Sequence, residues 1–267
     1  MSAIVSGNGT GLLNSSAALL GQRGLIGNAS TGRNGEAAYV NVATGNLVLQ
    51  DRDSFLASTG LDLALNRTYN AQGKFNDDNG DNWKFGLHKQ VTGLTGAVNT
   101  IDSTITRIDG DGTVSVYSWD QARQLYRSSD GAGAFDTLSL SGTNWLWTDG
   151  SSGIQESYDS TNNGRIISSN DPEGNALSFI YGDNGLLRRV NDASGESTLF
   201  TYIGNQVSEA SVALKGHLQS RTMVTPVAHW PWPFTVIGPN VLSIKRIWLM
   251  LRNISKKRKA SIRIWSK

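Results

Sequence analysis

The residues most able to do chemistry are acidic side chains in two glycine-rich stretches, Asp77-Asp78-Asn79-Gly80-Asp81-Asn82 and Asp109-Gly110-Asp111-Gly112. Ca²⁺ takes carboxylate and carbonyl oxygens as ligands in proteins, so either stretch could hold that ion. The first stretch lacks the bidentate Glu that ends an EF-hand loop. Asp, Asn and Gly are equally the residues that form tight turns. We therefore favour turns at both places and expect no bound metal and no cofactor.

The other reactive residue types do not form a catalytic constellation. His88, His217 and His229 share no metal-ligand spacing and no nucleophile motif. The chain has no cysteine, which excludes thiolate nucleophiles, thiolate ligands and disulfides. Its Asp and Glu residues are scattered, so the sequence marks out no pair of opposed carboxylates of the glycosidase kind. We expect no catalytic residue and no enzymatic activity.

Two tryptophans are the candidate binding residues. Trp145 and Trp147 are two positions apart in a strand-like run, so they share one face and could stack on sugar rings. The alternative is that they fill the buried face of a sheet, since aromatic residues favour strands. We favour the buried position and keep a carbohydrate contact through Trp145 and Trp147 as the second interpretation.

A tandem repeat between residues 158 and 207 organises the chain. Its copies begin at Tyr158, Tyr181 and Tyr202, which are 23 and 21 residues apart. Each tyrosine is followed by a glycine-containing turn and a short apolar run, and a second turn lies halfway along each full copy. The predicted turns are Asn163-Gly164, Pro172-Glu173-Gly174, Asn184-Gly185 and Ser194-Gly195. A repeat of this length predicts a fold that stacks one small unit.

Each repeat copy is expected to be two short strands joined by tight turns. Asn-Gly favours positive φ at both central residues of a hairpin turn. Apolar and polar residues alternate in 176–181 and 197–202, which predicts strands with one buried face. Upstream, we predict further strands at 37–42, 46–50, 61–69, 83–90, 104–108, 113–119, 137–140, 145–148 and 154–158. The fold class is therefore all-β, with antiparallel hairpins stacked side by side into a curved sheet.

The repeat resembles the YD repeat of Rhs (rearrangement hotspot) proteins. Tyr-Asp or Tyr-Gly-Asp, a Gly-Arg or Gly-Leu pair and Asp-x-x-Gly recur at about 21 residues. Upstream, 39–49, 63–70 and Gly80-Asp81-Asn82-Trp83 look like the opening of an Rhs core. The resemblance covers roughly residues 37–210. Asp171-Pro172-Glu173-Gly174 matches the family's self-cleavage motif in its letters. It lies inside a repeat and lacks the glycine-rich sequel, so we interpret it as a turn.

The resemblance implies a structural, non-enzymatic role. Rhs proteins wind their hairpins into a hollow shell that encloses a C-terminal toxic domain. The expected partners are therefore that domain and an export machinery, and the expected location is secreted or at the cell surface. The chain would supply only the first wall and would not close a cavity by itself. The second interpretation is a surface carbohydrate-binding or adhesin-like module with a glycan as its partner.

Composition divides the chain into three parts. Residues 1–36 are rich in Gly, Ser and Asn and predict a flexible leader, which lacks the basic start and apolar core of an ordinary signal peptide. Residues 37–212 are the Rhs-like β region. In 213–267 there are 11 Lys or Arg and no Asp or Glu, whereas 1–212 hold 13 basic against 22 acidic residues, a net charge of −9.

The basic tail is interpreted as an out-of-frame extension or a recombination junction. Four of the chain's five prolines lie in it, and its composition changes abruptly. The alternative is a membrane or nucleic-acid binding element, with an amphipathic helix at 244–251 and the basic run Lys256-Lys257-Arg258-Lys259. The segment would be very short for a toxin domain. We expect an irregular or weakly helical tail, no membrane span, no specific nucleic acid and an unpaired strand edge at Tyr202–Val207.

Overall fold

The computed structural model describes residues 3–5, 12, 37–56, 60–72, 83–128, 135–214 and 217–221. Contacts divide the chain into Met1–Phe234 and Thr235–Lys267, and the second unit lies outside the described residues. The acidic stretch 77–82 and the tail beyond Arg221 also lie outside them. Among the described residues there is no helix long and apolar enough to cross a membrane.

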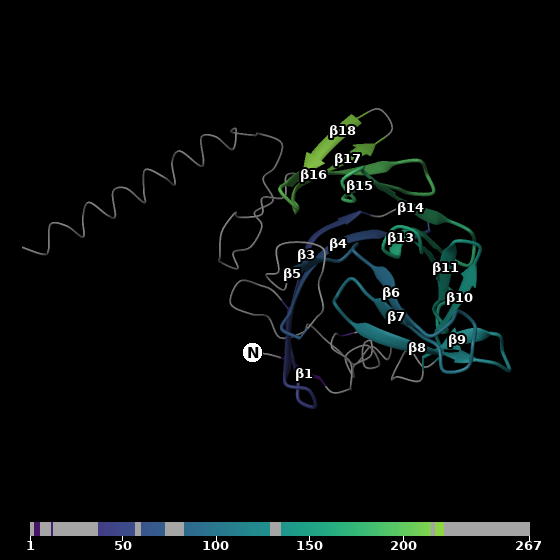
Figure 1. Cartoon of the computed structure of the whole chain (residues 1–267). Helices are drawn as coiled ribbons and strands as arrows, with labels where there is room; N and C mark the ends of the chain where they lie inside the picture. Colours follow the sequence, from purple (N-terminus) through teal and green to yellow (C-terminus); the bar gives the residue numbers. More distant parts are fainter. Residues whose placement is uncertain are drawn as a thin grey trace, which may run out of the picture. The chain divides into compact units, whose positions relative to one another are not determined.

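The fold is all-β, as predicted, and the described part forms no helix. The strands are β1 Ala3–Val5, β2 Ala37–Asn41, β3 Asn46–Leu56, β4 Leu63–Asn70, β5 Trp83–Phe85, β6 Gln90–Thr95, β7 Thr104–Ile108, β8 Val114–Asp120, β9 Leu125–Arg127, β10 Thr137–Ser141, β11 Asn144–Thr148, β12 Gln155–Asp159, β13 Arg165–Asn170, β14 Ala176–Tyr181, β15 Leu187–Asn191, β16 Ser197–Ile203, β17 Gln206–Leu214 and β18 His217–Arg221. Strands β1–β5 form one sheet and β6–β18 form a second (Figure 1).

The second sheet closes on itself before it continues. Strand β13 pairs both with β12 and with β6, so that β6–β13 form a ring of eight strands. The closing bonds run from Val91 N to Gly164 O (2.8 Å) and from Ile166 N to Lys89 O (3.2 Å). Strands β14–β18 then extend from β13 as an open run of antiparallel neighbours. The side-by-side hairpins are confirmed, and the closure is an addition to the predicted curved sheet.

The three repeat tyrosines occupy equivalent positions in the sheet. The strand register shifts immediately before Tyr158, Tyr181 and Tyr202, so each tyrosine lies at a β-bulge. The Tyr181 hydroxyl donates to the carbonyl oxygen of Ile166, and the Tyr202 hydroxyl donates to that of Leu187, both at 2.8 Å. Each acceptor lies 15 residues before its tyrosine, and both acceptor residues are fully buried. The repeat is therefore a packing unit that ties Tyr181 and Tyr202 to the strand that precedes each of them.

The turns match the prediction at one Asn-Gly pair and differ at the other. Asn163 and Gly164 both have positive φ, 58° and 64°. At Asn184-Gly185 only the glycine does, with φ 79°, so the expectation of positive φ at both residues is wrong there. The loop is longer, because Gly182 N donates to Leu186 O at 2.9 Å. The same five-residue spacing closes 171–175 and 192–196, where a single glycine supplies the left-handed residue.

Two upstream predictions need correction. The predicted strand 83–90 is two strands in different sheets, because the chain turns at 86–87 and His88 N donates to Phe85 O at 2.9 Å. The strand at Leu125–Arg127 was not predicted, since its three residues are too short to show alternation. Strand β1 lies inside the segment predicted to be a flexible leader. It pairs in parallel with β2, with Ala3 opposite Tyr39.

The carboxyl end of the described sheet also differs from the prediction. The strand edge predicted to be unpaired at 202–207 is paired, because Tyr202 lies opposite Val207 within the β16–β17 hairpin. Strand β17 crosses the predicted boundary at residue 212 and pairs with β18, so regular strand continues to Arg221.

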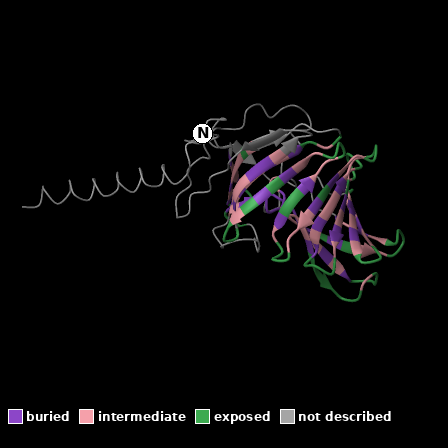
Figure 2. Ribbon diagram, turned by 90° about the horizontal axis from the view of Figure 1, so that it is seen from above, coloured by how far each residue is buried: buried purple, intermediate pink, exposed green. Residues whose placement is uncertain are grey.

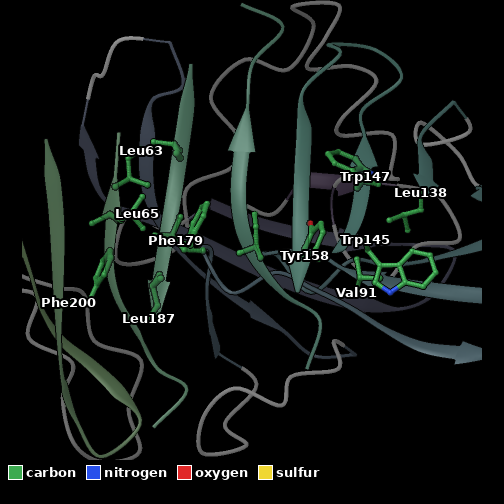
Figure 3. Close-up of a cluster of buried hydrophobic side chains, with 14 of the residues drawn as sticks. Leu63, Leu65, Val91, Leu138, Trp145, Trp147, Tyr158, Phe179, Leu187 and Phe200 are labelled. Carbon is green, nitrogen blue, oxygen red and sulfur yellow. The ribbon is translucent and has the colours of Figure 1, made fainter. Parts of the chain in front are cut away.

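Alternating burial shows where the core lies. Along the strands, buried positions alternate with exposed or half-buried ones, and exposed residues gather at the turns (Figure 2). Leu63 and Leu65 of β4 belong to the same buried cluster as Phe179 and Phe200 of the repeats (Figure 3). The rings of Phe85 and Phe200 meet edge to face at 5.4 Å between centroids. The two sheets therefore share one apolar core.

Candidate functional site

The turn between β7 and β8, Asp109–Thr113, is buried along its whole length. It has the same backbone bonds as the repeat turns, with Asp109 N donating to Thr113 O and Gly112 N to Asp109 O, both at 2.9 Å. The repeat turns 171–175 and 192–196 are exposed or half-buried. Loops normally lie on the surface, where water satisfies their polar groups. A buried turn must find partners inside the protein.

Two contacts of this turn come from the five-stranded sheet and from the residue that follows it. A Cβ atom added to Gly110 would lie 1.9 Å from the carbonyl oxygen of Gly86, so the two backbones approach with no room for a side chain. Asn70 Nδ2 at the end of β4 donates to Asp111 O at 3.1 Å. Asn70 Oδ1 in turn accepts from Asn46 Nδ2 at 2.9 Å. The turn is thus the joint between the five-stranded sheet and the ring.

Beside the joint lies a compact cluster of four charges. Arg107 of β7 contacts Asp109 and Glu156 of β12, each at 2.7 Å. Lys89, just before β6, lies 2.5 Å from Glu156 and 3.6 Å from Asp109. The side chains of Arg107 and Glu156 are only 4% and 3% exposed. Burying an ion costs several kcal/mol unless it is paired, and here two cations balance two carboxylates.

The cluster stays ionised because its members face one another. Burial acts to raise the pKa of Asp109, but Arg107 and Lys89 outweigh it and hold that pKa below its usual range. Burial likewise acts to raise the pKa of Glu156, and Lys89 and Arg107 lower it on balance. For Lys89, burial acts to lower the pKa, whereas Asp109 and Glu156 raise it above its ordinary value. All four groups are therefore charged at neutral pH.

Tyr158, the first repeat tyrosine, belongs to this cluster. Burial raises its pKa well above the ordinary value, so the phenol stays protonated. Its hydroxyl donates to Glu156 Oε2 at 2.5 Å and accepts from Arg107 Nε at 2.9 Å. The side chains of Arg107, Glu156 and Tyr158 tie β7 to β12 across the inside of the ring. Sequence reasoning used Tyr158 only as a repeat marker and did not identify Arg107 or Glu156.

Trp145 and Trp147 share a face, as expected, and that face is the interior of the ring. They are 4% and 7% exposed. The guanidinium carbon of Arg107 lies 3.8 Å from the ring centroid of Trp147, and Trp147 Nε1 donates to Tyr117 hydroxyl at 2.9 Å. Trp145 packs edge to face on Tyr126 at 5.5 Å. Arg107 already stacks on the ring of Trp147, and burial supports the core interpretation of both tryptophans.

The carboxylates at 109–112 are already engaged. Asp109 is paired with Arg107, and Asp111 accepts from Thr113 N and Leu12 N, both at 2.8 Å. Within the described ranges, no three His, Cys, Asp or Glu residues are placed to hold a metal ion together. His88 packs edge-on against Phe85. The side chain of His217, and the whole of His229, lie outside the described residues.

A cavity of about 620 Å³ opens beside the joint, within the size range of small-ligand and peptide side-chain sites. Its lining combines apolar side chains with carboxylates and Lys89. Its lining comprises Leu12, Tyr39, Gln50, Leu61, Asp62, Leu63, Ala64, Asn66, Thr68, Gly86, Leu87, Lys89, Asp109, Gly110, Asp111, Ile154, Glu156, Ile166, Ser169, Leu177 and Phe179. Both sheets and the first repeat strands therefore contribute to one space.

Comparison with protein families gives a match to part of the chain. A protein-family model described as a domain of unknown function (DUF6531) matches residues 38–117. A search of curated proteins found nothing that matches the chain. The matched stretch runs from β2 into β8, so it contains the buried turn together with Gly86, Lys89 and Arg107. It stops before β12 and the repeats.

Proposed function

We propose that the chain is a structural, non-enzymatic wall segment of a shell of the Rhs, YD-repeat type. The observation that carries the proposal is the equivalence of the repeats. Tyr181 and Tyr202 each lie at a bulge and each donate a hydrogen bond to a carbonyl 15 residues earlier. A unit that fixes itself to the preceding strand by the same contact can be added again and again. Stability then grows from neighbour interfaces, as in other repeat arrays.

The ring and the joint give such a wall a fixed start. An array of hairpins needs a capped end. Here β14, the first strand of the open run, pairs with β13 of the closed ring. The buried charge cluster supports a positioning role, because its four ionised groups form ion pairs with one another. We propose that the surroundings of Arg107 hold strands in register and do no chemistry.

The resemblance to Rhs proteins supplies the rest of the proposal. The wall would form part of a shell around a C-terminal toxic domain, carried outside by an export machinery. The sheet would then separate the enclosed toxic domain from everything outside the shell.

Lengthening the array tests whether the unit builds a wall. A second copy of 182–202 inserted directly after Tyr202 should add one more hairpin with little loss of stability. The matched control is an insertion of the same composition in scrambled order. Hydrogen exchange should show the native copy protected as well as β15 and β16, and the scrambled copy unprotected. Equal exchange in both insertions would contradict the proposal.

Enclosure needs a separate readout. A protease-labile reporter fused after Lys267 should be cleaved more slowly as native copies are added, and at a constant rate as scrambled copies are added. Cleavage that ignores the number of native copies would refute the enclosing role and leave the repeat as a mere stacking unit. Saturable binding of the folded chain on a glycan array would favour the surface-module interpretation instead.

A further inference from the structure

The cavity beside the joint has a lining of both apolar and polar residues. Leu61, Leu63, Leu177 and Phe179 are apolar members of its lining and can contact an aliphatic side chain. The lining also includes Asp111, a hydrogen-bond acceptor that could fix a peptide backbone. Apolar pockets with a few placed polar groups are the usual form of a specific binding site.

Asp111 is held ready as an acceptor. Its Oδ1 accepts from Thr113 N at 2.8 Å within its own turn. That turn is fixed in place by the Gly110–Gly86 approach and by Asn70. Asp111 Oδ2 therefore has a set position and is directed at a donor from another part of the chain. A preset acceptor lowers the entropy cost of binding a peptide.

The donor is a residue of the amino-terminal segment. Leu12 N donates to Asp111 Oδ2 at 2.8 Å, across 99 residues of sequence, and Leu12 is itself part of the cavity lining. The N–H of Leu12 on Asp111 and the place of Leu12 in the cavity lining are the two observations that link this residue to the cavity.

Strand β1 provides the tether. It pairs with β2 through Val5 opposite Asn41, and six residues separate Val5 from Leu12. A stretch of that length reaches at most about 25 Å. A short tether keeps the local concentration of a linked ligand in the millimolar range, so even a weak site would be filled.

We propose that this cavity is the docking site of the chain's own amino-terminal segment, with Leu12 as its anchor. Through the Leu12–Asp111 hydrogen bond, the segment would strengthen the joint that Asp109–Thr113 makes. The inference is independent of the shell proposal, because it concerns only contacts at the joint.

Two substitutions in the full chain separate the two contacts. Leu12→Asp sets a carboxylate against Asp111 and removes the aliphatic group. Leu12→Pro keeps an apolar side chain and deletes the N–H donor. We expect each to raise hydrogen exchange at 61–66 and 109–113 by about tenfold or more and to increase binding of the apolar dye 8-anilinonaphthalene-1-sulfonate. Leu19→Asp, with the same change of charge and polarity, serves as the control and should leave both readouts unchanged.

A peptide added in trans completes the test. A synthetic peptide of residues 8–16 should restore protection at 61–66 and 109–113 in the Leu12→Asp chain, and its Leu12→Pro form should not. Exchange in 165–203 must stay as in the original chain, which shows that the fold is intact. Unchanged exchange at the cavity in both Leu12 variants, or equal rescue by both peptides, overturns the proposal.

Discussion

Gly164→Ala should open the ring. Gly164 has a φ of 64°, and a Cβ atom there would lie 1.7 Å from the carbonyl oxygen of Val91. A left-handed conformation costs an alanine about 1–2 kcal/mol. The clash is with backbone, so strands β6 and β13 must separate and lose the Val91–Gly164 and Ile166–Lys89 bonds, each worth about 0.5–1.5 kcal/mol. The expected loss of stability is therefore about 2–5 kcal/mol.

The matched control is Gly195→Ala. Gly195 has a φ of 84°, and nothing lies within 4 Å of its added Cβ. That substitution should cost only the conformational part, about 1–2 kcal/mol. Urea unfolding followed by circular dichroism and tryptophan fluorescence gives both free energies of unfolding. Losses that agree within about 0.5 kcal/mol would refute the claim that closure at Gly164 stabilises the ring.

Three further outcomes follow from the same contacts. Gly110→Ala should weaken the joint, because its Cβ would lie 1.9 Å from Gly86 O; hydrogen exchange should rise in 38–72 and stay constant in 187–203. Tyr181→Phe and Tyr202→Phe should each cost about 0.5–1.5 kcal/mol in urea unfolding, and an additive double variant would show that the two copies act independently. The pKa of Asp136 is raised to about 6, chiefly by burial. As pH falls, the folded chain therefore binds a proton at Asp136 before the unfolded chain does. Stability should rise through this residue as pH falls from above 6 towards 4. Asp136→Asn should remove that rise from melting temperatures measured across this range, and an unchanged profile would argue against it.

The pH dependence of the charge cluster has the opposite sign. The pKa values of Asp109 and Glu156 are lowered in the fold, so their contribution is present above the unfolded-state values near 4. It is lost as pH falls through the folded-state values, which lie lower. Glu156→Gln should therefore reduce the fall in melting temperature below pH 4. A fall as steep as in the original chain would show that the cluster does not control acid unfolding.

Local patterns in the sequence predict the strands well. Alternation and glycine turns placed most of β2–β16 to within a few residues, because each hairpin is decided by its own turn and its own buried face. The same reasoning joined β5 and β6 into one strand. Both halves of 83–90 have strand character, and only their partners reveal that they belong to different sheets.

The candidate site could be predicted only in part. Period-two alternation places Arg107 on the same face as Ile105, and Glu156 on the same face as Tyr158. That pattern was a usable signal for inward-facing charges. The pairing itself cannot be read from the pattern, and it is the contacts of Arg107 and Glu156 with each other and with Asp109 and Lys89 that make their burial tolerable. The approach of Gly164 to Val91 joins residues 73 positions apart and leaves no local trace.

Closure of the ring also gives the molecule an order of assembly during synthesis. Strands β6–β13 are complete once residue 170 has been made, before the hairpins of β14–β18 exist. Synthesis proceeds at about 5–20 residues per second, and β domains fold in milliseconds to seconds. The ring therefore has time to form first and to act as a template. Each later hairpin would emerge next to a finished strand, which shortens the time that any sheet edge is open to misfolding or to another chain.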